Sequence, residues 1–203
     1  MPTTPPDTEE YLRRIAAGDV TATSALLDRH RGRLRRMVAI RVDPRIAARV
    51  DPSDVVQDVL MEAATKLPEY ARHRPLPFYP WLRQLGWDRI SDLYALHVQA
   101  QRRSVCREQA PLADRSADML VRRLIDRGAQ PSHRLLKDEL RRRVRAALDA
   151  LDPRDREVLV MRHLEQMTLA ETAASLGISV GAVKMRRLRA VERLRQTLDE
   201  EDV

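Results

Sequence analysis

The stretch "LAETAASLGISVGAVKMRRLRAVERLR", residues 169–195, constrains the fold most, because it places a single glycine between two short helical patterns before a run of arginines. Apolar residues flank Gly177, and Ala173 lies four residues before it. A small residue lets two helices cross closely, and glycine readily adopts the left-handed conformation that such a turn needs. The stretch therefore predicts a helix-turn-helix, with Ser179 as the N-cap of its second helix.

The predicted second helix, residues 179–198, carries six basic side chains against one glutamate. The N-terminal half of such a helix can enter a DNA major groove, where basic groups bind phosphates and guanine edges. The alternative is an ordinary helical hairpin with a solvated basic face. The residues expected to contact DNA lie near the helix start and off an apolar stripe of Val183 and Val191. They are Lys184, Met185, Arg186 and Arg189.

Composition supports an all-α chain with a polyanionic partner. Aromatic residues make up 3% of the chain and there are only six glycines, which favours helices over strands. The net charge of +7 suits nucleic acid, although arginine enrichment through codon bias is an alternative source of this charge. A length of 203 residues is sufficient for two small domains.

Other classes of protein are disfavoured. Cys106 is the single cysteine, so we expect no disulfide framework and no metal knuckle. The acidic residues between Asp51 and Glu62 lack a histidine, and capping and solvation explain them better than a metal does. No nucleotide-binding glycine pattern or catalytic histidine motif occurs, so we expect no catalysis, no metal and no cofactor. Without a signal-peptide core or an 18-residue apolar run, we expect a soluble cytoplasmic protein with no membrane insertion.

Local signals divide the chain into helices. Asp51 is expected to cap a helix with Pro52 in its first position and a Val- and Leu-rich buried stripe up to Leu67. The proline-rich segment that follows, from Pro68, is expected to be a loop, with helix resuming at Trp81. The C-terminal part predicts four helices, at residues 132–151, 153–163, 168–176 and 179–198. The intervening segment has the polar character of a linker, with a short helix possible in "MLVRRLIDRG".

Three stretches together resemble a known family. Residues 151–195, "LDPRDREVLVMRHLEQMTLAETAASLGISVGAVKMRRLRAVERLR", resemble region four of bacterial sigma factors of the sigma-70 family, in particular the extracytoplasmic-function (ECF) group. Residues 51–67, "DPSDVVQDVLMEAATKL", and 78–94, "FYPWLRQLGWDRISDLY", resemble region two. The matches occur in the family's order.

The resemblance implies an all-α fold of two small helical domains. Residues 9–104 would be a region two helical bundle, 105–131 a linker, and 132–198 a region four helix-turn-helix. It implies that the first domain binds the clamp of core RNA polymerase and opens the minus-ten promoter element, while the second binds the minus-thirty-five element. The expected partners are core RNA polymerase, promoter DNA and, as a further option, an anti-sigma protein, with the free chain a monomer in the bacterial cytoplasm.

The resemblance also assigns site residues. Asp54, Gln57 and Asp58 match the polymerase-binding surface. For the minus-thirty-five element, the expected contacts are the residues at the start of the basic helix, namely Ser179, Lys184, Met185, Arg186 and Arg189. The segment from Pro68 to Tyr79 matches the one that captures a flipped minus-ten base.

Aromatic residues support strand capture independently, since six of the seven lie between residues 70 and 94. Bases stack on aromatic faces for roughly 1–3 kcal/mol each. We expect Phe78 and Trp81 to be buried, which leaves other aromatics for stacking. The expected minus-ten residues are Tyr70, Tyr79, Trp87, Asp88, Arg89, Arg102 and Arg103.

The chain departs from the family pattern at three positions. Asp88 replaces a usual asparagine and Ala95 a common basic residue on the DNA-facing helix, so Asp88 either selects a base donor or faces inward. Arg187 replaces a common leucine, which predicts a slightly rotated buried register in the last helix. Two further functions stay open: a helix-turn-helix regulator that binds DNA unaided, and a polymerase-binding scaffold without promoter specificity.

Overall fold

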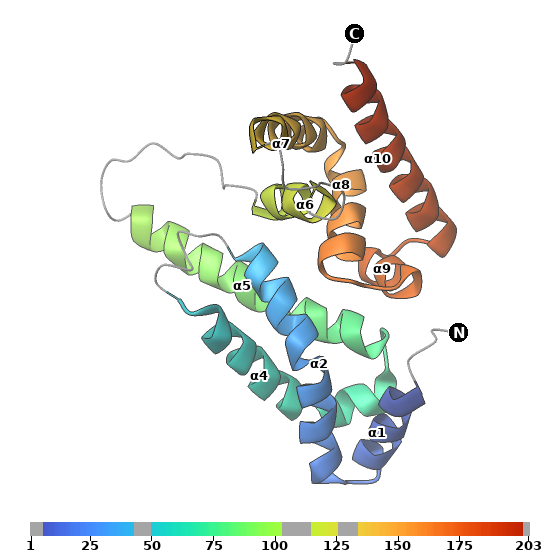
Figure 1. Ribbon diagram of the computed structural model, residues 1–203. Coiled ribbons are helices and arrows are strands. Elements are labelled where there is room, and N and C mark those ends of the chain that lie inside the picture. The colour runs from blue at the N-terminus through green and yellow to red at the C-terminus, as the bar shows by residue number, and fades with distance from the viewer. Residues whose placement is uncertain (1–5, 43–49, 103–114, 126–133, 201–203) are drawn as a thin grey trace. The chain divides into compact units, whose positions relative to one another are not determined.

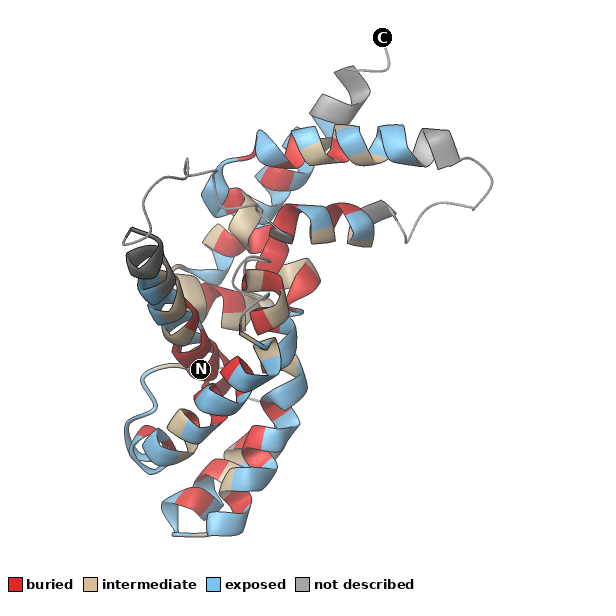
Figure 2. Ribbon diagram, turned by 90° about the vertical axis from the view of Figure 1, so that its left-hand side faces the viewer, coloured by how far each residue is buried: buried red, intermediate tan, exposed pale blue. Residues whose placement is uncertain are grey.

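The computed structural model describes residues 6–42, 50–102, 115–125 and 134–200, and within these ranges every element is helical (Figure 1). The all-α prediction is therefore confirmed. The chain divides into two compact units, Met1–Ala113 and Asp114–Val203. Buried and exposed residues recur in alternate patches along the helices, as amphipathic helices around a core require (Figure 2).

The first unit consists of α1 (Pro6–Ala16), α2 (Val20–Arg41), α4 (Pro52–His73) and α5 (Phe78–Arg102). Leucine, valine and methionine side chains from all four helices form one core, including Leu12, Leu34, Met37 and Leu82, each at most 1% exposed. Gly86 lies where α5 crosses α2, because a Cβ there would be 3.1 Å from Leu34 Cδ1. This close approach explains a glycine in mid-helix.

The start and the buried face of α4 match the sequence prediction. Asp51 is the N-cap and accepts a hydrogen bond from the Ser53 amide at 2.7 Å, with Pro52 in the first turn. The predicted stripe is buried, and it comprises Val55, Val56, Val59, Leu60, Ala63 and Leu67.

The end of α4 corrects the prediction of a loop from Pro68. The helix continues through Pro68 to His73, and only four residues, 74–77, separate it from α5. Pro68 removes one backbone donor, but Tyr70 and Ala71 beyond it are buried in the core and hold the last turns helical. Arg74, in the left-handed conformation, ends the helix.

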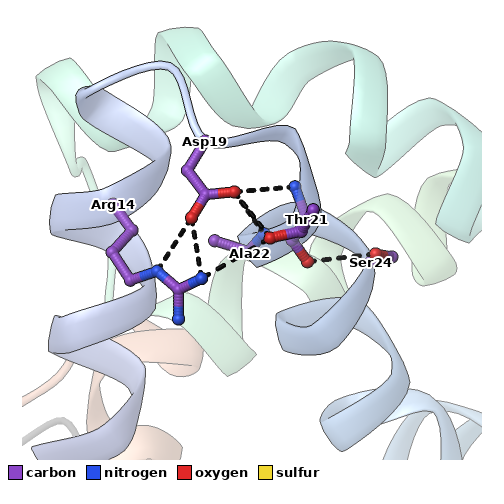
Figure 3. A network of polar contacts seen from close by, with 5 residues as sticks. All are labelled: Arg14, Asp19, Thr21, Ala22 and Ser24. Carbon is purple, nitrogen blue, oxygen red and sulfur yellow. Dashed lines mark hydrogen bonds and ion pairs between the residues drawn. The ribbon is translucent and has the colours of Figure 1, made fainter.

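Asp19 joins α1 to α2 through a compact polar network (Figure 3). Its Oδ1 accepts hydrogen bonds from the amide and hydroxyl of Thr21 at 2.9 and 2.7 Å. Its Oδ2 accepts from Arg14 Nε and Nη2 at 2.9 and 2.7 Å. These bonds lower the pKa of the Asp19 carboxyl to about 2, with the Thr21 hydroxyl as the largest cause and Arg14 next.

The Asp19 network predicts an acid-dependent contribution to stability. Because the folded pKa lies below that of an unfolded aspartate, the stabilisation is complete above about pH 4 and is lost as the pH falls towards 2. Asp19→Asn should therefore lower the Tm at pH 7, and the difference from wild type should shrink between pH 4 and pH 2. Circular dichroism melts across this range test this, with Asp28→Asn, an exposed aspartate within α2, as the control. A pH-independent difference would contradict it.

The second unit consists of α6 (Arg115–Ile125), α7 (Arg134–Asp149), α8 (Pro153–Leu159), the π-helix η1 (Val160–Leu164), α9 (Leu169–Leu176) and α10 (Val180–Glu200). The four helices predicted from the sequence correspond to α7, the continuous pair α8 and η1, α9, and α10. Asp152 caps α8 by accepting from the Arg154 amide at 2.8 Å, with Pro153 at the first position.

Helix α6 lies within residues 105–131, which the sequence predicts to be a linker. Ala117, Leu120 and Val121 are at most 5% exposed, and α6 packs against α7 and η1 within the second unit. Arg145 of α7 pairs with Asp118 of α6 at 2.5 Å. Residues 115–125 are thus part of a packed unit, because the apolar side of "MLVRRLI" is buried against α7 and η1.

Candidate nucleic-acid interface

The turn between α9 and α10 has the geometry predicted from the sequence. Thr168 and Glu171 form a capping box at the start of α9, with bonds of 3.1 and 2.7 Å. Gly177 ends α9 at φ 63°, a conformation that a side chain would strain. Ser179 Oγ accepts a hydrogen bond from the Ala182 amide at 3.1 Å and so caps α10. The predicted helix-turn-helix is confirmed.

A small apolar cluster fixes the angle between these helices. Val158 of α8, Ala173 of α9 and Val183 of α10 pack together, all at most 5% exposed. Ala190 continues the buried side of α10, whereas Val191 is 49% exposed, so its place in the buried stripe was wrong. Seven residues make almost two full helical turns, which returns Ala190 but not Val191 to the face of Val183.

The opposite face of α10 is open to solvent near its start. Lys184 is exposed there, and Met185 and Leu188 are 52% and 58% exposed. Leu188 lies four residues after Lys184 and three after Met185, so it is a neighbour of both on this exposed side of the helix. Leu188 was missed as a candidate contact, although its spacing from Lys184 and Met185 would have identified it.

Arg186 and Arg189 lie on a different side of α10 from Lys184. Arg189 Nη2 pairs with Asp155 Oδ1 at 3.4 Å, and the Asp155 side chain is only 6% exposed. Arg186 is half-buried and lines, with Arg189, a hollow of about 190 Å³ beside the start of α8. An acidic partner on α8 therefore holds the Arg189 guanidinium in this conformation, while the Arg189 side chain stays 52% exposed; its contact with DNA stays a prediction.

The ion pair between Arg189 and Asp155 predicts that Arg189 contributes more to stability than the exposed Lys184 does. Arg189→Ala removes the cation paired with the buried Asp155 carboxylate, although Arg186 and Arg193 line the same hollow. It should destabilise the second unit by roughly 1 kcal/mol. Lys184→Ala, which removes an exposed group, should leave the free energy of unfolding within about 0.5 kcal/mol of wild type. Urea unfolding followed by circular dichroism measures both. Equal stability of the two variants would count against a structural role for Arg189.

In the first unit, two of the expected stacking residues are buried. Tyr70 is 4% exposed and stacks on Trp81 with ring centroids 4.4 Å apart, and burial raises the pKa of its hydroxyl. Tyr79 is 2% exposed, with the Arg33 guanidinium 3.6 Å above its ring. Neither ring can receive a base in this conformation, so both assignments are corrected. Phe78 is buried as expected and Trp81 is only partly buried.

Trp87 is the predicted stacking residue that offers a ring to solvent, since it is 43% exposed. The Arg41 guanidinium lies 5.3 Å and that of Arg83 lies 5.9 Å from its ring centroid. Arg83 is itself only 7% exposed, so Arg41 is the cation that a negatively charged strand would meet when a base stacks on this indole.

The remaining minus-ten candidates are Asp88, Arg89, Arg102 and Arg103, and no contact with the Trp87 ring is found for those that the structure describes. Asp88 is exposed, and partial desolvation followed by repulsion from Asp92 and Glu62 raises the pKa of its carboxyl. Arg89 pairs with Asp58 of α4 at 2.6 Å. Arg102 ends α5 and its side chain is outside the described part, while Arg103 lies outside the described residues altogether.

The predicted polymerase-binding residues share an exposed face of α4. Asp54, Gln57 and Asp58 are all exposed, and buried valines occupy the other side of the helix. Met61, one turn further along, is 63% exposed and extends this face with an apolar side chain. An exposed acidic face with one large apolar group suits a basic protein partner.

Other kinds of site are not evident in the described ranges. No group of three or more histidine, cysteine, aspartate or glutamate side chains there could hold a metal ion. No helix among those residues has both the length and the apolar character needed to cross a membrane.

Fold and site define an all-helical protein with a helix-turn-helix in its second unit. Residues 147–196 match the family model "Sigma-70, region 4". An RNA polymerase sigma-E factor of Streptomyces avermitilis is 34% identical over 164 residues, covering 72% of this chain and 83% of that protein. The RNA polymerase sigma factor CnrH of Cupriavidus metallidurans is 30% identical, covering 96% of each.

Two further similarities extend the comparison. The ECF RNA polymerase sigma factor SigD of Mycobacterium bovis is 28% identical, covering 94% of this chain and 83% of that protein. A solved structure of CnrH in complex with the cytosolic domain of CnrY matches with a TM-score of 0.54 and 27% identity, over 96% of this chain and 98% of that one. The chain belongs to the ECF group of the sigma-70 family of RNA polymerase sigma factors.

Proposed function

We propose that this chain directs core RNA polymerase to promoters and helps open them for transcription initiation. Membership of the sigma factor family supports this function. The observation that carries the DNA-binding part is the face of α10 that bears Lys184, Met185 and Leu188, since it is exposed at the start of the second helix of a helix-turn-helix. The chain performs no nucleotide chemistry of its own; polymerase supplies the catalysis.

The two units divide the work in this proposal. Region two, residues 9–104, binds the polymerase clamp through Asp54, Gln57 and Asp58 and takes up the minus-ten strand beside Trp87. Region four, residues 132–198, binds the minus-thirty-five element, with α6 packed against it. A lysine or arginine contact to a guanine edge would discriminate bases by about 1–3 kcal/mol.

The partners follow from the same proposal. Core RNA polymerase and promoter DNA are required, and the chain acts in the bacterial cytoplasm as a monomer when free. An anti-sigma protein is proposed as an inhibitor, which is supported by the similarity to CnrH, a sigma factor solved in complex with the cytosolic domain of CnrY.

Run-off transcription tests the function directly. Genomic promoter fragments are transcribed by core RNA polymerase with and without this protein, and with a Lys184→Ala, Met185→Ala variant. We expect transcripts that depend on the protein and that the double variant weakens by on the order of tenfold or more. Absence of such transcripts, together with tight salt-sensitive binding of the protein alone to duplex DNA, would instead indicate a regulator that acts without polymerase.

A further inference from the structure

Arg89 reaches from α5 to the predicted polymerase-binding face of α4. Its Nη2 lies 2.6 Å from Asp58 Oδ2, and the two residues are 31 positions apart in the chain. The Arg89 side chain is 37% exposed and that of Asp58 is 48% exposed. Within the described part of the chain, Arg89 Nε is buried and makes no hydrogen bond. The guanidinium is therefore buried at Nε and exposed in part elsewhere, and its Nη2 binds Asp58.

The surroundings of Arg89 are unfavourable for a DNA phosphate. Asp88 precedes it and Asp92 follows three residues later, and these two carboxylates repel each other enough to contribute to the raised pKa of Asp88. Glu62 of α4 adds to the same negative field, which Lys66 offsets in part. A phosphate approaching Arg89 would meet these carboxylates, whereas a basic partner would be attracted.

We propose that Arg89 is a positioning residue of the polymerase-binding surface: it holds the Asp58 carboxylate in place for a basic side chain of polymerase and does not contact promoter DNA. This inference rests on the proposed function of Asp58. An exposed aspartate samples several rotamers, and ordering it on binding costs free energy. An arginine that holds one oxygen of the carboxylate reduces this cost and leaves the other oxygen available.

The test is a double-mutant cycle on polymerase affinity. Full-length Arg89→Ala, Asp58→Asn and the double variant are titrated against fluorescently labelled core RNA polymerase. We expect Arg89→Ala to weaken binding about two- to fivefold, as loss of one exposed charge pair allows. Asp58→Asn should weaken it more, and the double variant should bind no worse than Asp58→Asn. Arg89→Lys should restore part of the affinity.

A second measurement separates positioning from DNA contact. Holoenzyme assembled at saturating concentrations of each variant is bound to promoter DNA over a range of salt concentrations. With Arg89→Ala the logarithmic salt dependence should equal that of wild type, because no phosphate contact has been removed. A slope smaller by about one, with polymerase affinity unchanged, would overturn the proposal and return Arg89 to the DNA-binding set.

Control variants distinguish three outcomes: loss of the fold, failure of the positioning role of Arg89, and failure of the proposed polymerase surface. Arg31→Ala removes an exposed pair with Asp28, at 3.2 Å, from α2, and it should leave polymerase affinity unchanged. Equal melting temperatures of Arg89→Ala and wild type show that the fold is intact. If Asp58→Asn weakens binding and Arg89→Ala does not, the positioning role alone fails. If neither Asp58→Asn nor Asp54→Asn weakens binding, the proposed polymerase surface itself fails.

Discussion

Val183→Asp should unfold the helix-turn-helix and abolish promoter-dependent transcription. Val183 is fully buried against Val158 and Ala173 in an apolar cluster. Burying an unpaired charge costs several kcal/mol, which is comparable to the total stability of a small domain, roughly 5–15 kcal/mol. The unit would lose the packing that sets α10 against α8 and α9, and the exposed face of α10 would no longer be presented to DNA.

Circular dichroism and run-off transcription measure this effect together. The matched control is Val191→Asp, which makes the same chemical change on the same helix at a position that is 49% exposed. It should retain the wild-type helical content and melting temperature. A Val183→Asp protein that melts like wild type would show that the Val158 cluster does not hold the turn in solution.

Asp54→Arg combined with Gln57→Ala should weaken binding to core RNA polymerase by at least about thirtyfold. Both side chains are exposed on α4, so the loss would come from the interface and not from the core. Replacing an acid by a base opposite a basic partner introduces repulsion as well as removing attraction, and such changes cost about 2–5 kcal/mol in desolvated interfaces. An arginine in the first turn also opposes the helix dipole, by about 0.3–1 kcal/mol.

The measurement is a titration of labelled core polymerase, supported by run-off transcription at two salt concentrations. Glu69→Arg, a charge reversal at an exposed position nearer the end of the same helix, is the control and should bind as wild type does. Wild-type affinity of the Asp54→Arg, Gln57→Ala protein would place the polymerase surface elsewhere on the unit.

Local sequence signals predicted most of the helices correctly. Asp51, Ser179 and Gly177 act within a few residues of themselves, so their capping and turn roles depend little on the rest of the fold. The periodic apolar residues of α4 likewise identify its buried face, because apolar residues repeated about every 3.6 positions form one stripe along a helix, and this stripe packs against the core. The exception is Pro68, where burial of the following turn outweighs the loss of one hydrogen bond.

The sequence by itself determined an all-helical chain, a helix-turn-helix with a basic second helix, and an exposed acidic face on α4. Only the tertiary structure decided which arginines and aromatics are free. Arg89 and Arg189 are held by Asp58 and Asp155, which lie 31 and 34 residues away. Periodicity shows which side of a helix is apolar, but it does not show which helix crosses that side or what charge it carries. Ion pairs between helices, and the burial of Tyr70 and Tyr79, depend on those crossings.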